Sequence, residues 1–325
     1  MFEKIPRSHF YALAAVSIWA FAYVGTRVAV QFIGSLELGF MRNLVAGLFF
    51  LVFLKAQKTT LLPPLRDWPL FALSGLLGYA LYLVLFNIGM ETLSAATSCI
   101  LVSTGPLISA FLASLIFKEK LSGLAWLAML VAFGGVALLS LWDGALTVNA
   151  GVFWTLGAAL CLGSYNIVQR YFSQRELPRP QGSARAGKNP FAHYSSVQIT
   201  AYSFFAAVVI SLPLAPSSLE QFAQITLGQQ SVVVLLGIFP SAISYLCWSK
   251  ALTIAQSTSS VANYMFLTPF LTLLLGMLLI SETPNAGLLA GGALILGGLG
   301  LFSLAGRRSR VLAQRLRQAG KTDDN

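Results

Sequence analysis

Charged residues are scarce in this sequence. Asp, Glu, Lys and Arg together make up 10% of its 325 residues, whereas a typical soluble domain carries about 25%. Hydrophobic residues make up 56%, and the mean hydropathy is +0.75. These values exclude a water-soluble fold. The composition indicates an integral membrane protein that contacts the lipid bilayer along most of its length.

Histidine and cysteine are also sparse. The two histidines, His9 and His193, lie at the edges of apolar segments, and the three cysteines lie inside such segments without CxxC or His-paired spacing. This pattern predicts no disulfide framework, no metal site and no cofactor. A membrane enzyme would need a nucleophile with a base, a metal cluster or paired carboxylates. Because the sequence shows none of these motifs, we do not expect an enzyme.

Acidic residues are missing from the interiors of the apolar segments. All 11 map to loops, termini or segment edges. A proton-coupled carrier normally has a protonatable group along its pathway. This absence therefore favours facilitated diffusion, or coupling through a group that the sequence pattern does not reveal.

Ten apolar stretches are long enough to cross the roughly 30 Å hydrocarbon core as helices. Their expected ranges are 11–32, 37–55, 68–89, 94–117, 122–142, 150–171, 193–214, 231–252, 257–280 and 286–305. If the N-terminus is cytoplasmic, 19 of the 21 Lys and Arg residues fall on the cytoplasmic side. Cytoplasmic loops are enriched in these residues, so both termini are expected to be cytoplasmic. The same topology explains the net charge of +10 without a nucleic-acid partner.

The second half of the sequence repeats features of the first at a fixed offset of 163 residues. The pairs that share this offset are Tyr82 and Tyr245, Pro106 and Pro269, Glu119 and Glu282, and Gly134 and Gly297. Duplicated sets of helices are the usual construction of secondary transporters. Each repeat has five spans, an odd number, so the second repeat begins on the opposite side of the membrane. The expected fold is an all-α membrane protein with ten transmembrane helices in a 5+5 inverted-topology repeat.

Polar segments suggest how the chain is divided. The first repeat is expected over residues 1–149 and the second over 150–305, followed by a basic cytoplasmic tail over 306–325. The longest polar break, 172–192, is rich in Pro, Gly and Arg, and it is predicted to be a mobile cytoplasmic linker. Two interpretations of the tail remain open, a short amphipathic helix and a disordered segment.

Several motifs together resemble a known family. Each half has a proline in its fourth span, a glutamate thirteen residues later and a glycine-rich fifth span. The run WAFAYVGTR begins at Trp19, and the run RNLVAG begins at Arg42. These features resemble the drug/metabolite transporter (DMT) superfamily and, more narrowly, its EamA-type bacterial transporters. The second half departs from both runs, with Cys161 in place of the Trp and Tyr202 in place of the Arg, and the 172–192 break is longer than usual.

This resemblance implies an inner-membrane secondary transporter without enzymatic activity. Members of the family export small polar metabolites, often amino acids or related compounds, by alternating access. The resemblance does not select one substrate, because the family's substrates differ widely. It also leaves the oligomeric state open between a monomer and a homodimer.

Polar and aromatic residues fall on single faces of several spans. Lipid cannot satisfy polar side chains, so these faces are expected to converge on a central cavity for a small-molecule substrate. The candidate substrate-binding residues are Trp19, Tyr23, Arg27, Tyr79, Tyr82, Tyr165, Asn166, Ser241, Tyr245, Trp248, Asn263 and Tyr264. For each residue taken alone, helix–helix hydrogen bonding or interfacial anchoring is the competing interpretation.

Two further pairs are candidates for moving parts. Pro106 and Pro269 are expected to act as hinges, because a proline inside a helix removes one hydrogen bond and displaces the carbonyl four residues earlier. Those carbonyls belong to Val102 and Met265, and the alternative is a fixed bend satisfied by nearby hydroxyls. Glu119 and Glu282 follow the fourth and ninth spans and are expected to act as gates or loop caps on opposite membrane faces.

Arg27 and Arg42 support a second functional hypothesis. Both lie inside spans, where a charge is costly, and an arginine fork can bind a carboxylate or phosphate. They could therefore clamp phosphorylated or nucleotide-linked anions, in a transporter or exchanger. Alternatively, they extend to the membrane surface, or Arg42 pairs with Glu37. A polytopic membrane enzyme or a channel is the remaining, more distant alternative.

Overall fold

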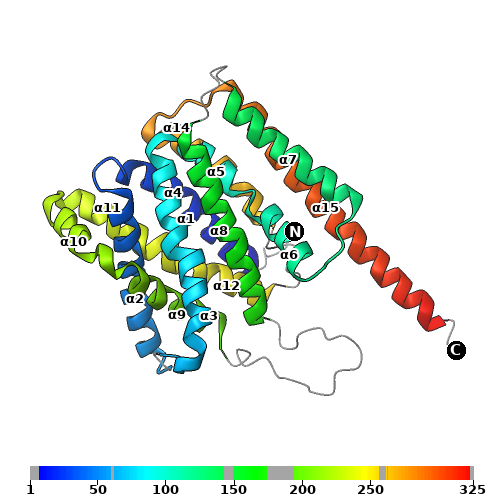
Figure 1. Cartoon of the computed structure of the whole chain (residues 1–325), viewed down its shortest axis with the longest axis horizontal. Helices are drawn as coiled ribbons and strands as arrows, with labels where there is room; N and C mark the ends of the chain where they lie inside the picture. Colours follow the sequence, from blue (N-terminus) through cyan, green and yellow to red (C-terminus); the bar gives the residue numbers. More distant parts are fainter. Residues whose placement is uncertain are drawn as a thin grey trace, which may run out of the picture.

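The computed structural model describes residues 7–59, 62–142, 149–173, 194–255, 261 and 263–322, without the side chains of 307–322. Within these residues the chain forms helices and no β-strand, and ten helical spans are long and apolar enough to cross a membrane. The helices assemble into a bundle with one helix pair along its side (Figure 1). The predicted all-α membrane fold is confirmed.

Five spans come from each half of the chain. The first half comprises α1 (Arg7–Ala29), α2 (Ser35–Ala56), η1 (Leu65–Asp67), α3 (Trp68–Gly75), η2 (Leu76–Ala80), α4 (Leu81–Thr92), α5 (Ala95–Val102), α6 (Gly105–Ile116) and α7 (Gly123–Leu141). The second half comprises α8 (Ala150–Ser173), α9 (Ser196–Ser211), η3 (Leu212–Leu214), α10 (Ala215–Gln224), α11 (Leu227–Ile238), η4 (Phe239–Ile243), α12 (Ser244–Ile254), η5 (Asn263–Phe266), α14 (Leu267–Ile280) and α15 (Ala286–Thr322).

Several helices begin at a side chain that satisfies their first backbone amides. The Ser94 hydroxyl accepts from the Thr97 amide at the start of α5, and Ser122 does the same for Ala125 at the start of α7. Thr226 and Gln229 form a reciprocal capping box at the start of α11. Such caps are typically worth about 1 kcal/mol each. They fix where the apolar spans leave the membrane.

Two expected boundaries are wrong. The connection expected between residues 214 and 231 contains a helix, α10, which begins with a proline in its first turn. The expected linker begins too early, because α8 continues to Ser173 and Phe172 is buried against Phe71, with ring centroids 5.0 Å apart. The tenth span ends at Gly306, close to the expected residue 305, and α15 continues to Thr322, so most of the tail is helical, which is one of the two alternatives. The rest of the linker lies outside the described residues, as does the beginning of the ninth span.

Local backbone features repeat with the same 163-residue offset as the sequence motifs. The third span contains a π-helical turn, η2, and the eighth contains another, η4, at the equivalent residues. Lys118 and Ser281 both adopt left-handed backbone conformations, with φ of 53° and 54°. Each directly precedes one of the duplicated glutamates. The duplication is therefore present in the backbone as well as in residue identities.

The duplicated prolines both lie where a span changes its backbone geometry. The fourth span is interrupted between Val102 and Gly105, and Pro106 is the second residue of α6. In the ninth span the 3₁₀ turn η5 runs directly into α14, in which Pro269 is the third residue. Hydroxyls of Ser103 and Thr104 donate to the carbonyls of Cys99 and Leu101 at 2.8 and 2.7 Å. They therefore stabilise the turn before the break and do not replace the bond lost at Val102.

Each helix contact between the halves has a counterpart in which the equivalent spans of the two halves change places. The first span packs on the eighth (α1 on α12), and the sixth packs on the third (α8 on α4). Likewise α1 packs on α14, while α8 packs on α5 and α6. The second and seventh spans, α2 and α9, pack on each other, as do the fifth and tenth, α7 and α15. This pattern describes a pseudo-two-fold arrangement, which supports the inverted repeat that the sequence predicts.

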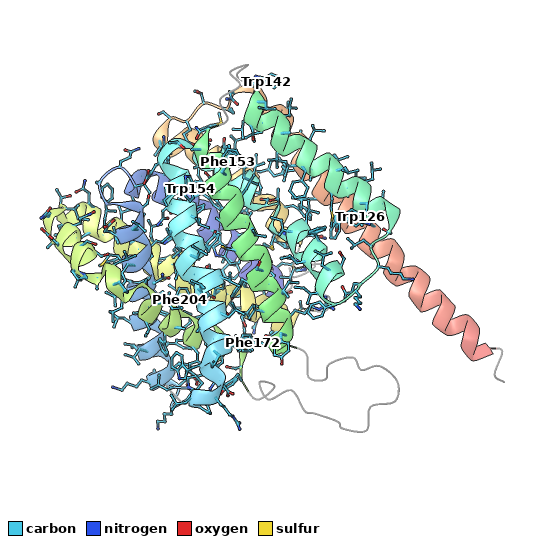
Figure 2. All side chains as sticks on the ribbon, in the orientation of Figure 1. Trp126, Trp142, Phe153, Trp154, Phe172 and Phe204 are labelled. Atoms are coloured by element: carbon cyan, nitrogen blue, oxygen red, sulfur yellow. The ribbon has the colours of Figure 1, made fainter. Side chains whose placement is uncertain are left out.

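Aromatic side chains separate into an outer and an inner group (Figure 2). Trp126, Trp142 and Trp154 project from α7 and α8 with 44–46% of their surface exposed. Trp142 and Trp154 lie near one end of the bundle and Trp126 nearer the other, as expected for side chains at the two membrane interfaces. By contrast, Phe204 is fully buried and packs on Phe50 and Tyr79. It belongs to the main core between the halves.

Candidate functional site

The duplicated tyrosines lie near one shared arginine. Tyr82 from α4 and Tyr245 from α12 both lie within electrostatic range of the Arg42 guanidinium on α2. Tyr23 from α1 lies near both tyrosines and beside Cys99, and its ring packs edge-on against Phe86 at 5.3 Å. Three predicted substrate-binding residues, contributed by both halves, are therefore brought together.

An indole pair extends this cluster along α1 and α12. The Trp19 ring lies 5.7 Å from Tyr245 and 5.4 Å from Trp248, measured between centroids. Its Nε1 donates to the Pro240 carbonyl at 3.3 Å. Pro240 lies in the π-helical turn η4, a geometry that is often found at functional sites. These aromatic faces could hold a cationic group through cation–π contacts.

Tyr79 and Tyr165 lie deeper in the core than the sequence suggested. Their hydroxyls bond each other at 2.9 Å, and both side chains are buried. The Tyr79 ring packs at 3.8 Å on Phe204 and at 5.9 Å on Tyr245. Because the two hydroxyls share a hydrogen bond inside the core, the contacts favour a packing role beside the site, while substrate binding by the pair stays a prediction.

The remaining polar candidates lie around the cluster. Asn166 donates to Ser109 at 3.1 Å between α8 and α6, and the buried Ser241 donates to the Leu236 carbonyl at 3.2 Å. Tyr264 bonds His9 at 3.0 Å between their side chains and packs on the same small cluster as Trp248. Asn263 is exposed on η5. Their role in substrate binding also stays a prediction.

Arg27 does not point into the cluster. Its Nη1 donates to the carbonyls of Met90 and Glu91, at 2.6 and 2.8 Å, at the end of α4. Its Nε lies 3.8 Å from Glu282 Oε1. The Glu282 carboxylate also accepts from the Ala95 amide at 3.0 and 3.1 Å, where α5 begins. Arg27 thus places a positive charge at the C-terminal end of α4, and Glu282 places a negative charge at the N-terminal end of α5. The helix dipoles favour a charge of that sign at each end. We call the Arg27–Glu282 pair the outer latch, after the side on which the expected topology with cytoplasmic termini would place it.

Glu119 forms a matching ion pair elsewhere in the bundle. Arg170 on α8 bonds both Glu119 oxygens, one of them at 3.1 Å, and its guanidinium lies 4.8 Å from the Phe117 ring centroid. We call the Arg170–Glu119 pair the inner latch. Each latch joins the loop after the fourth span of one half to the first span of the other half. The sequence singled out both glutamates, and the structure supplies their partners.

The two latches lie at opposite ends of the bundle. The beginning of α8 meets the end of α4, where the Thr92 hydroxyl donates to Asn149 Oδ1 at 2.8 Å. This is the end at which Arg27 bonds Glu91. Arg170 lies near the other end of α8, about 30 Å away at 1.5 Å per residue. That separation matches the thickness of the hydrocarbon core.

The inner latch carries a pH dependence. Hydrogen bonds from Arg170 lower the pKa of Glu119 below its usual value. The ion pair therefore stabilises the folded protein fully above the ordinary glutamate pKa of about 4.3. This stabilisation is lost as the pH falls through the lower pKa that Glu119 has in the folded protein. At 46% side-chain exposure the pair contributes less than about 1 kcal/mol. We expect wild type to unfold at a slightly higher temperature than Glu119→Gln at neutral pH. The two melting temperatures should converge in acid, and a difference that grows in acid would contradict this assignment.

Sequence reasoning singled out Arg42 but not its neighbour Asn43, and the structure places both in the interior. Arg42 is 5% exposed, and among the described residues it forms no ion pair with Glu37, contrary to one of the expected alternatives. The neighbouring Asn43 is 1% exposed, and neither of its amide atoms has a hydrogen-bond partner in the described part of the chain. Asn43 belongs to the RNLVAG run noted in the sequence. Its polarity inside an apolar span was the signal that could have identified it.

Comparison with known proteins identifies the family. The sequence model of the EamA-like transporter family matches residues 6–141 and 182–304. The chain is 26% identical over 285 residues to "Uncharacterized transporter YdfC" of Bacillus subtilis, covering 87% of each. It is 28% identical over 300 residues to a "Probable terminal-alkyne amino-acid exporter" of Streptantibioticus cattleyicolor, covering 92% of this chain and 94% of that one.

A solved crystal structure shares the fold. It is 18% identical in sequence, covers 93% of this chain and 98% of its own, and superposes with a TM-score of 0.58. Together with ten apolar spans, the family match over most of the chain shows that this multi-pass membrane protein is a transporter of the DMT superfamily and belongs to the EamA-like transporter family.

Proposed function

We propose that this protein exports amino acids or related small polar metabolites across the inner membrane by alternating access, with both termini in the cytoplasm. One observation carries the proposal. Two ion pairs at opposite ends of the bundle, each joining one half to the other, flank a central cluster of tyrosines drawn from both halves. A transporter needs such a site with a separate closure on each side.

The latches suggest how access alternates. Both are formed in this structure, and in this proposal each closes one end of the central cluster. Opening one end requires only that the halves separate at one latch while the other persists. Because the halves are related by duplication, the same movement applied to the other half opens the other end. Pro106 and Pro269 are the proposed hinges, since each lies where a span of the moving half changes its geometry.

The substrate class rests on the site and on one relative. The cluster has one buried guanidinium and several aromatic faces, which suit a molecule carrying both a carboxylate and an ammonium. The similar Streptantibioticus protein is described as a probable amino-acid exporter. The anion-clamp alternative loses one of its two arginines, because Arg27 is engaged by the end of α4 and by Glu282.

Flux through proteoliposomes tests the proposal. Purified protein would be reconstituted and screened for counterflow of amino acids, including the terminal-alkyne amino acid propargylglycine, against sugars, nucleosides and phosphorylated metabolites. Each compound would be assayed with and without a proton gradient. We expect counterflow of an amino-acid class with no gradient requirement. Movement of phosphorylated compounds alone would instead establish the anion transporter, and no movement of any compound by folded protein would contradict both.

The aromatic cluster makes a separate prediction. Trp19→Ala is expected to raise the apparent KM for the transported amino acid about 5- to 30-fold, because a desolvated cation–π contact contributes about 1–2 kcal/mol. Trp126→Ala is the matched control, since that indole on α7 is 46% exposed and packs on Phe111, outside the aromatic cluster. An equal effect in both variants would indicate a general loss of stability rather than loss of a binding surface.

A further inference from the structure

Arg42 is a buried charge whose hydrogen-bonding capacity is mostly unused. It is the eighth residue of α2, about 10 Å along the helix from its beginning, and only 5% of its surface is exposed. A guanidinium has five N–H donors in a planar fork. The hydrogen bond that the described residues provide joins its Nη1 to Thr26 Oγ1, at 3.1 Å. Its Nε has no acceptor within the described part of the chain.

No carboxylate of the described residues neutralises this charge. Their three ion pairs join Arg27 to Glu282, Arg66 to Asp67 and Arg170 to Glu119. The titratable groups that interact with Arg42 are the phenols of Tyr82 and Tyr245. An isolated charge in a low-dielectric interior costs several kcal/mol unless it is paired. Arg42 therefore offers an unneutralised charge to an anionic partner from outside the chain.

We propose that Arg42 is the binding site for a single carboxylate of the substrate, with the Tyr82 and Tyr245 hydroxyls as additional donors. This inference rests on the proposed function, because it names the group by which the transported molecule is held. The two tyrosines come from opposite halves, so a carboxylate at Arg42 would touch both halves at once. Binding there would therefore be sensitive to the relative position of the halves.

The charge balance selects a carboxylate over a phosphate ester. Arg42 supplies one positive charge, and its charged surroundings include no second cation among the described residues. A dianionic phosphate would leave one negative charge uncompensated in the interior, which is costly. A monoanionic carboxylate fits one guanidinium bidentately. The ammonium of an amino acid would then lie toward Trp19, whose ring packs on Tyr245, and toward Trp248, which packs on Trp19.

The first test measures binding without requiring transport. Purified wild type and Arg42→Gln would be heated with propargylglycine or with its carboxamide, at matched ionic strength. We expect the acid, and not the amide, to raise the melting temperature of wild type. Arg42→Gln should lose this discrimination, with apparent affinity for the acid reduced about 10-fold or more, as for loss of a charge-assisted hydrogen bond. Arg42→Lys should retain part of it, because the charge remains while the fork is lost.

The melting temperature without ligand separates binding from a structural role. Removing an unpaired buried charge should leave Arg42→Gln at least as stable as wild type, whereas a structural Arg42 would make this variant less stable. Equal stabilisation of wild type by acid and amide would overturn the proposal, whatever the flux assay shows. Stronger protection by a phosphorylated metabolite than by the amino acid would overturn the carboxylate assignment. Acid-specific binding without any flux would support the site and contradict the proposed transport function.

Discussion

Bridging either latch with a covalent spacer is expected to abolish transport, leaving less than about a tenth of wild-type flux, because alternating access requires each end to open in turn. The outer bridge uses Arg27→Cys with Glu282→Cys, and the inner bridge uses Glu119→Cys with Arg170→Cys. Cys99, Cys161 and Cys247 would first be replaced by alanine. The reagent is a bifunctional thiol reagent with a reducible spacer, since a direct disulfide needs Cα atoms within about 7 Å. Flux would be measured before bridging, after it and after reduction.

Two controls isolate the bridge from the loss of the native side chains. Each single-cysteine variant treated with the same reagent shows the effect of losing the ion pair alone. A double variant, Glu220→Cys with Gln224→Cys, places both thiols one turn apart on the exposed face of α10, where a bridge joins nothing across the halves. Reduction should restore flux only in the two latch variants. Undiminished flux with either latch bridged, as verified by mass, would show that this end does not separate during transport.

The duplication could be predicted from the sequence because it leaves identical residues at a fixed spacing. Tyr82 and Tyr245, like Glu119 and Glu282, occupy equivalent places in the two halves, and the structure brings both tyrosines to Arg42. The repeated backbone features could not be predicted. A π-helical turn adds one residue to a helix without altering its apolar composition. Pro240 marks an interruption of the eighth span but not its π-helical form, and the equivalent turn in the third span contains no proline.

The partners of the glutamates could not be predicted either. Arg170 follows Glu119 by 51 residues and Glu282 follows Arg27 by 255, and only the packing of one half on the other brings them together. For Arg42 the sequence left three alternatives open: an anion clamp, an extension to the membrane surface, and a pair with Glu37, five residues earlier. The structure leaves Arg42 in the interior without that partner. Pairing with a neighbour on the same helix therefore does not occur at Arg42, the residue that we propose to bind the substrate. An internal partner would compete there with the bound ligand.

Adding a methyl group to Gly135 and to Gly298, the second glycine of each duplicated pair, is expected to separate the fifth span from the tenth. A Cβ at Gly135 would lie 2.6 Å from the Gly291 carbonyl, and a Cβ at Gly298 would lie 2.7 Å from the Ala128 carbonyl. Backbone cannot move aside as a flexible side chain can. The seam between α7 and α15 is therefore a close backbone approach that only glycine permits. Because α7 packs chiefly on α15, little else holds it in place.

The double variant Gly135→Ala/Gly298→Ala should lose about 2–6 kcal/mol, taking about 1–3 kcal/mol for each overpacked position. In detergent this corresponds to a melting temperature lower by roughly 10 °C. The matched control is Gly134→Ala/Gly297→Ala, one residue earlier in each pair, where an added Cβ meets no atom of a neighbouring element within 4 Å. That control should melt close to wild type. Equal losses in both double variants would contradict the seam assignment, because helix propensity favours alanine over glycine at all four positions and only Gly135 and Gly298 approach a neighbouring backbone.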